Sequence, residues 1–208
     1  MTRIELKSQA KAAIRTSKPH YALVMLAVLI FTAAIVGVQN ALAPDPNSYE
    51  LPSMAYSIVS LLVAIVSVMV DTGLKWYGLM LIRGNGQNAG RAFSLVYGCF
   101  ITVLVTSIVI GIFTALWSLL LIIPGIIASY RYRMAMYIIH DDPEVGIMEA
   151  IRKSKQMMVG HKMDLFVLDL SFIGWGLLSV ITLGIATLYV GPYVAATQAA
   201  FYDSIQHS

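Results

Sequence analysis

Long runs of apolar residues alternate with short polar segments along almost the whole chain. Three of these runs carry no charged side chain, and they cover residues 21–43, 54–70 and 92–130. A helix of about 20 apolar residues crosses the ~30 Å hydrocarbon core of a bilayer. The pattern therefore predicts a single all-α domain over residues 1–208, folded as a polytopic bundle of membrane helices.

Basic residues fall in every second connector. The segment before the first run contains Arg3, Lys7, Lys11, Arg15 and Lys18. The connectors 44–53 and 184–192 contain no Lys or Arg, whereas 83–91 contains Arg83 and Arg91, and 140–163 contains Arg152, Lys153, Lys155 and Lys162. Under the positive-inside rule, the basic connectors and both termini lie in the cytoplasm.

This alternation predicts about six transmembrane helices. They are expected at 21–43, 54–82, 93–123, 124–140, 164–183 and 189–206. Pro124-Gly125 is the expected break before the fourth, because proline removes a backbone donor and clashes with the preceding turn. At about 17 residues, the fourth helix is just long enough to cross, so a full span and a re-entrant segment both stay open.

The composition agrees with a membrane protein. Hydrophobic residues make up 58% of the chain and charged residues 12%, against about 25% charged in soluble domains. The net charge of +3 does not predict nucleic-acid binding, because the positive residues follow the topology. Cys99 is the single cysteine, so the chain has no internal disulfide, and we expect Cys99 to pack inside the bundle.

Two polar segments are expected to form helices at the cytoplasmic surface. In the basic segment 1–20, positive residues recur every four positions beside an apolar face, which suits a helix lying on an anionic leaflet. Simple anchoring without a folded helix is the alternative. In the connector 141–163, a helix over 142–160 is predicted, with Asp142 as the cap, Pro143 in the first turn and Gly160 as the stop.

Several ionisable residues lie within the predicted helices, where a charge costs at least ~2.5–3.5 kcal/mol on insertion scales. The candidate binding residues among them are Asp71, Lys75, Arg131, Arg133 and Asp169. Asp71 and Lys75 can pair one turn apart, and Arg131 is the arginine expected to point into a pocket with Asp71 and Asp169. One interpretation is a polar pocket for a lipid headgroup, amphiphile or small solute. The other is a set of interhelical salt bridges.

Other kinds of function have weaker support. A protein partner is an alternative, docking through Arg152, Lys153 and Lys155 of the cytoplasmic helix, and small-residue stripes leave a homo-oligomer open. His140-Asp141-Asp142 is the densest group of metal-capable side chains, but three adjacent residues cannot converge on one ion from a helix. Nucleophile, zinc-protease and phosphate-loop motifs are missing from the sequence. We therefore expect no catalytic residues, no metal and no cofactor.

Motifs in residues 123–202 carry a family resemblance. They are Pro124-Gly125, Asp142-Pro143, Glu149-Ala150-Ile151 with Ser154, Gly160 before Lys162, Ser171 to Trp175, and the ending from Pro192-Tyr193 to Ala200-Phe201-Tyr202. The spacing of Leu6-Lys7 and Ala10-Lys11 also fits. In these features the chain resembles a bacterial multi-pass membrane family catalogued as domain of unknown function 975. The resemblance implies a protein of the plasma membrane and brings no activity with it.

Overall fold

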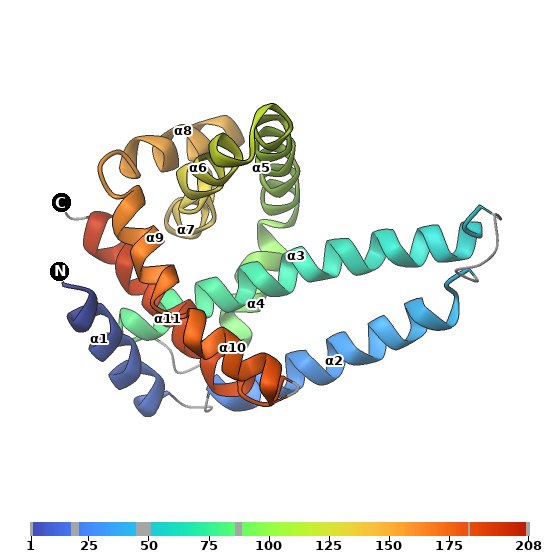
Figure 1. Ribbon diagram of the computed structural model, residues 1–208, viewed down its shortest axis with the longest axis horizontal. Coiled ribbons are helices and arrows are strands. Elements are labelled where there is room, and N and C mark those ends of the chain that lie inside the picture. The colour runs from blue at the N-terminus through green and yellow to red at the C-terminus, as the bar shows by residue number, and fades with distance from the viewer. Residues whose placement is uncertain (1, 18–20, 45–50, 86–88, 183, 207–208) are drawn as a thin grey trace.

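The computed structural model describes residues 2–17, 21–44, 51–85, 89–182 and 184–206. Every regular element in these ranges is an α-helix (Figure 1), which confirms the predicted all-α class. The helices are α1 (Arg3–Thr16), α2 (Tyr21–Ala41), α3 (Met54–Ile82), α4 (Ala89–Gly98), α5 (Phe100–Leu120), α6 (Ile122–Tyr132), α7 (Ala135–Asp141), α8 (Ile147–Met157), α9 (Lys162–Leu170), α10 (Ile173–Ile181) and α11 (Thr187–Gln206).

Helices α2 and α3 pair as a long hairpin that projects away from the rest of the molecule, while both termini lie at the opposite end (Figure 1). The outer part of the hairpin exposes apolar side chains, among them Ile30, Leu61 and Leu62. The C-terminal part of α3 instead enters the core, where Trp76 and Tyr77 are almost completely buried. One helix therefore changes along its length from an apolar exposed rod to the centre of the packed body.

The core joins α3, α7 and the second half of α11. All of Ala135 to Ile139 in α7 is buried, and the ring of Tyr137 stacks on that of Tyr202 with 5.0 Å between centroids. The close approach of α3 to α11 depends on Gly78, because a Cβ at that position would lie 3.3 Å from the backbone of Ala195. This packing positions α7, whose first turn borders the candidate site.

Four helical segments in the described part of the chain are long and apolar enough to cross a membrane. They are Leu23–Ala41, Met54–Ile82, Phe100–Leu119 and Lys162–Ile181, the last of which combines α9 and α10. They match four of the six predicted spans and support a membrane protein. The spans predicted at 124–140 and 189–206 are not confirmed by this criterion.

The predicted helices 93–123 and 124–140 each divide in two. The first divides at Cys99, between α4 and α5, and the second divides after Tyr132, between α6 and α7. The expected break at Pro124 falls three residues earlier, at the extended residue Leu121, so that Pro124 lies in the first turn of α6. Proline is tolerated there because the amide groups of a first turn lack helical partners.

The two predicted surface helices form, with different details. Helix α1 buries Leu6 and Ala10 and packs on α11 and α3, so part of its apolar face contacts protein instead of a leaflet, while Lys11 and Arg15 stay exposed. Helix α8 begins at Ile147, with Gly146 as its N-cap. The predicted cap at Asp142 is therefore wrong, because Asp142 ends α7, where its N–H donates to the carbonyl oxygen of Ile138.

Candidate functional site

A cavity of about 410 Å³ lies between α3, α5, α6 and the start of α7; we call it the polar cavity for its charged and hydroxyl side chains, although most of its wall is apolar. Its charged lining residues are Asp71 and Lys75 from α3 and Arg133, which follows α6. Five hydroxyl-bearing side chains share the lining, namely Thr72, Ser107, Thr114, Ser129 and Tyr132. Apolar residues such as Ile110 and Met136 complete the walls. The cavity therefore brings charges of both signs and hydroxyl groups together between largely apolar helices.

The helical periodicity explains why these residues share the cavity. Asp71 and Lys75 lie one turn apart on α3, and Ser107, Gly111 and Thr114 follow at spacings of four and three on α5. The stripe of small residues on α5, at the four-residue spacing of Ser107 and Gly111, is of a kind that allows close packing of helices. In the structure, Ser107 and Gly111 of that stripe leave room for the cavity.

The charged side chains at this site form two ion pairs. Lys75 Nζ lies 2.6 Å from Asp71 Oδ2, so this local pair agrees with the spacing in the sequence. Arg133 Nη2 lies 3.3 Å from Asp169 Oδ2, and Asp169 also accepts hydrogen bonds from the Tyr130 hydroxyl and the Gln198 amide, each at 3.1 Å. Two cations and two carboxylates therefore balance each other at this site.

Arg133 occupies the position that the sequence favoured for Arg131. Arg133 lines the cavity, whereas Arg131 is not among the cavity residues. The reason is the break between α6 and α7. The Ser154 hydroxyl from α8 donates to the carbonyl oxygen of Arg131 at 2.9 Å and accepts from the amide of Met134 at 3.2 Å. Ser154 thereby replaces part of the helical hydrogen bonding and turns the chain at Arg133.

Two serine hydroxyl groups of the cavity wall can act only as acceptors toward its interior. Ser107 Oγ donates to the carbonyl oxygen of Val103 at 2.8 Å, and Ser129 Oγ donates to that of Ile126 at 2.7 Å. Since each hydroxyl has one proton and two lone pairs, these two serines have used their donors on their own helices. They can still accept hydrogen bonds from a ligand.

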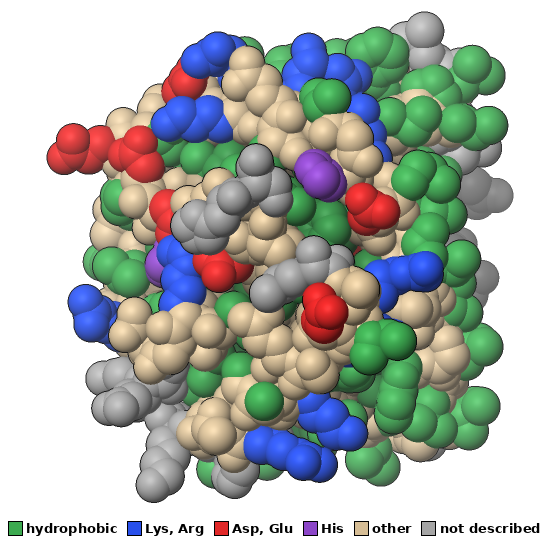
Figure 2. Space-filling model, turned by 90° about the vertical axis from the view of Figure 1, so that its left-hand side faces the viewer, with side chains coloured by type: hydrophobic (Ala, Val, Ile, Leu, Met, Phe, Trp, Pro, Cys, Tyr) green, Lys and Arg blue, Asp and Glu red, His purple; other side chains and the backbone are tan. Residues whose placement is uncertain are grey.

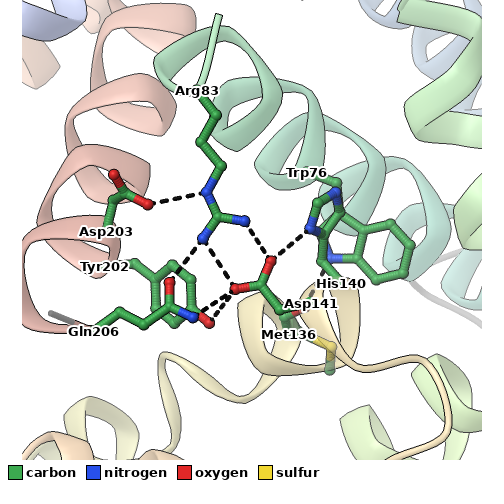
Figure 3. Close-up of polar contacts among 8 residues, drawn as sticks. All are labelled: Trp76, Arg83, Met136, His140, Asp141, Tyr202, Asp203 and Gln206. Atoms are coloured by element: carbon green, nitrogen blue, oxygen red, sulfur yellow. Dashed lines mark hydrogen bonds and ion pairs between the residues drawn. The ribbon is translucent and has the colours of Figure 1, made fainter. Parts of the chain in front are cut away.

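A second polar cluster lies where the ends of α3, α7 and α11 meet (Figure 3). The guanidinium of Arg83 contacts the Asp141 carboxylate through Nη1 and Nη2, and its Nε donates to Asp203 Oδ1 at 2.9 Å. Asp141 also accepts from the Tyr202 hydroxyl at 2.8 Å and from Gln206 Nε2 at 3.1 Å. This network joins residues from three helices into one anchor for the end of α7.

The environment of the cluster favours its charged forms. Burial alone would raise the pKa of Asp141, but hydrogen bonds from His140, Arg83 and Tyr202 outweigh it and hold that pKa well below its ordinary value. The hydrogen bond to Asp141 raises the pKa of Arg83 above its ordinary value. The pair is therefore ionised throughout the physiological pH range.

The sequence did not reveal this cluster as a unit. Arg83 was interpreted as a topology signal, and Asp141 was considered only as part of a metal-binding group. A usable signal was the position of Asp141 two residues after the apolar run Ala135–Ile139, since a carboxylate at the end of a buried helix needs a partner. Which residue pairs with it depends on tertiary packing.

Comparison with known proteins assigns the second half of the chain to a family pattern. Residues 118–208 match the model of the family described as "Protein of unknown function (DUF975)". This confirms the resemblance for the region that holds Arg133, Asp141 and Asp169. Asp71, Lys75 and the N-terminal spacing lie before the match. No curated protein and no solved structure matches the chain.

The three basic residues proposed for partner docking lie in α8 with different surroundings. Arg152 forms two hydrogen bonds with Glu149, at 2.6 and 2.7 Å, and Lys153 Nζ lies 3.6 Å from Asp142 Oδ2. Lys155 is exposed. Two of the three charges therefore have partners within the chain.

The end of the molecule that carries both termini is rich in charged side chains of both signs (Figure 2). This mixture is what is expected of a face in contact with water. Within the described residues, no three His, Cys, Asp or Glu side chains are placed to hold a metal ion together. His140 instead contributes its Nδ1 to the Asp141 network, at 3.1 Å.

Proposed function

We propose that this protein is a non-enzymatic membrane protein that binds the polar group of a membrane amphiphile in the cavity between α3, α5 and α6. The observation that carries the proposal is the position of Arg133, which lines the cavity and whose guanidinium has one hydrogen-bonded partner among the described residues, Asp169, at 3.3 Å. A guanidinium has five N–H donors and suits bidentate contact with phosphate or carboxylate. Its remaining donors are available to a ligand.

The surroundings of the cavity support an amphiphile as the ligand. Helices α5 and α6 expose Ile108, Ile112 and Ile126 near the hydroxyl-lined wall. Such a surface is covered by acyl chains in a bilayer. A molecule with one polar and one apolar part can satisfy the charged cavity and the apolar surface together, whereas charges left without partners in the membrane are costly.

Native mass spectrometry in a mild detergent tests this proposal. We expect the wild type to retain a lipid or other amphiphile, and Arg133→Gln to lose it. Arg91→Gln is the matched control, because Arg91 is exposed on α4 and outside the cavity lining. Equal retention by wild type and Arg133→Gln, with both variants folded, would overturn the proposal.

We further propose six crossings of the plasma membrane with both termini in the cytoplasm. The two crossings that lack a long apolar helix are α6–α7 and α11. Burial supports α11 as a crossing, because Thr197 and Gln198 are buried against the protein and do not face lipid. The low hydropathy of α11 is then compatible with a position inside the bundle.

Single-cysteine labelling distinguishes six crossings from four. In a Cys99→Ser background, the probe is placed on three connectors by the substitutions Leu51→Cys, Lys155→Cys and Ile185→Cys. Six crossings place residues 51 and 185 outside the cell and residue 155 in the cytoplasm. If only the four long apolar segments cross, residue 155 lies outside the cell and residue 185 lies in the cytoplasm. Labelling of intact cells by an impermeant maleimide at residue 155 would contradict the proposal.

Partner docking through α8 is the second candidate function. One observation favours it, because the exposed side chains of Met148, Arg152 and Lys155 recur at spacings of four and three along one face. Charge reversal at Lys155 is expected to abolish capture of such a partner and leave amphiphile retention unchanged. Loss of amphiphile in Lys155→Glu would contradict a separate docking face.

A further inference from the structure

A second hollow adjoins the polar cavity. It is a groove of about 200 Å³ between α2 and α3, and its walls are mostly apolar, with Ile35, Val63, Val66 and Leu74 among them. Asp71 lines both the groove and the polar cavity. On α3 the groove follows one face, through residues 63, 66, 70 and 74, and the cavity follows the neighbouring face, through 68, 71, 72 and 75.

The two hollows together match the parts of a phospholipid. The polar cavity has room for a headgroup, and the apolar groove beside it has room for part of an acyl chain. Because Asp71 borders both, a ligand that fills them must pass its carboxylate. A small water-soluble solute would use the cavity and leave the groove without a function.

The charge balance of the cavity selects the kind of headgroup. Asp71 and Asp169 neutralise Lys75 and Arg133, so a headgroup with net charge would leave one charge without a counter-charge between helices of a membrane protein, where such charges are costly. A zwitterion keeps the balance, with its phosphate at the guanidinium of Arg133 and its cation at the carboxylate of Asp71. Lys75 occupies only Oδ2 of that carboxylate.

The hydroxyl groups distinguish between two zwitterions. Ser107 and Ser129 offer acceptors to the cavity, because their protons already bind their own helices. A primary ammonium has three N–H donors that can use these acceptors and Asp71 Oδ1. A quaternary ammonium has no such donor, and it is bound by aromatic cages. The lining therefore favours a primary amine.

We infer that the ligand is an aminophospholipid of the phosphatidylethanolamine type, with its headgroup in the cavity and one acyl chain in the α2–α3 groove. This inference rests on the proposed function. Asp71 would then be the residue that determines headgroup specificity, while Arg133 supplies binding to any phosphate.

Lipid competition tests the headgroup. The protein is exposed to equal amounts of phosphatidylethanolamine, phosphatidylglycerol and phosphatidylcholine with identical chains, and bound lipids are read by native mass spectrometry. We expect a preference of about tenfold or more for phosphatidylethanolamine, the change expected from one charge-assisted hydrogen bond. Asp71→Asn should remove the preference, Asp71→Glu should retain it, and the exposed control Glu144→Gln should leave it unchanged.

Two further arms test the groove. Val66→Trp should fill the groove and weaken lipid retention, while Leu61→Trp, at an exposed position outside the groove lining, should not. Free glycerophosphoethanolamine should be retained much less than the lipid. Equal retention of this soluble headgroup would overturn the role of the groove.

The possible failures can be told apart. Retention of all three lipids without preference, still lost in Arg133→Gln, would overturn the aminophospholipid and leave the proposed function standing. Retention of no lipid at all would overturn both.

Discussion

The ion pair between Arg83 and Asp141 should make a large contribution to stability, and Asp141→Asn tests it. The two side chains are 28% and 18% exposed, so the pair lies between a surface and a buried salt bridge. Breaking a buried pair costs about 3–5 kcal/mol and an exposed pair contributes less than about 1 kcal/mol. Arg83 keeps Asp203 and Gln206 as partners in the variant. We therefore expect a loss of about 2–3 kcal/mol.

Thermal unfolding in detergent, followed by tryptophan fluorescence, measures this effect. For a chain of this size, 1 kcal/mol corresponds to roughly 2–4 °C, so Tm should fall by roughly 4–12 °C. Glu149→Gln is the matched control, because it breaks the surface contact with Arg152, which also has two hydrogen bonds. A Tm for Asp141→Asn no lower than that of Glu149→Gln would refute the reasoning.

The same pair predicts a dependence on pH. The pKa of Asp141 is depressed in the folded protein relative to its ordinary value of 3.8. Its contribution is therefore fully present above that value and is lost as the pH falls through the folded pKa. The Tm difference between wild type and Asp141→Asn should narrow below about pH 4. A difference that widens on acidification would contradict this assignment.

Three further substitutions test the packing around the site. Ser154→Ala leaves the buried amide of Met134 without its acceptor, which costs about 1–3 kcal/mol. It should therefore lower both Tm and amphiphile retention. Ser94→Ala, at an exposed position of α4, should change neither. Gly78→Ala should reduce the free energy of unfolding by about 1–3 kcal/mol and lower Tm, because the new methyl group would press against the backbone of Ala195. Gly37→Ala is the control and should not lower Tm, because its methyl group would meet open space. Trp76→Phe removes the 2.7 Å hydrogen bond to the Met136 carbonyl, so the free energy of unfolding should fall by about 1 kcal/mol and Tm should fall with it. Unfolding of this variant is followed by circular dichroism.

Local features of this fold could be predicted from sequence. The apolar runs gave the positions of α2, the first part of α3 and α5, because length and hydropathy are properties of a segment alone. The Asp71–Lys75 pair followed from a spacing of four. These predictions needed no knowledge of which helices become neighbours.

Features that depend on contacts between distant residues were predicted wrongly or were not predicted. The choice between Arg131 and Arg133 is made at the break between α6 and α7, and that break depends on Ser154, 20 residues beyond Met134. The Arg83–Asp141 pair joins residues 58 positions apart. Periodicity within one helix carries no information on either pairing.

The most direct test of the account is a structure of the wild-type protein in lipid nanodiscs that contain phosphatidylethanolamine. The account predicts an elongated density whose polar end lies within hydrogen-bond distance of the Arg133 guanidinium, and whose tail follows the groove between α2 and α3. A cavity closed by its own side chains, or a lipid bound elsewhere with Arg133 engaged only by Asp169, would contradict it.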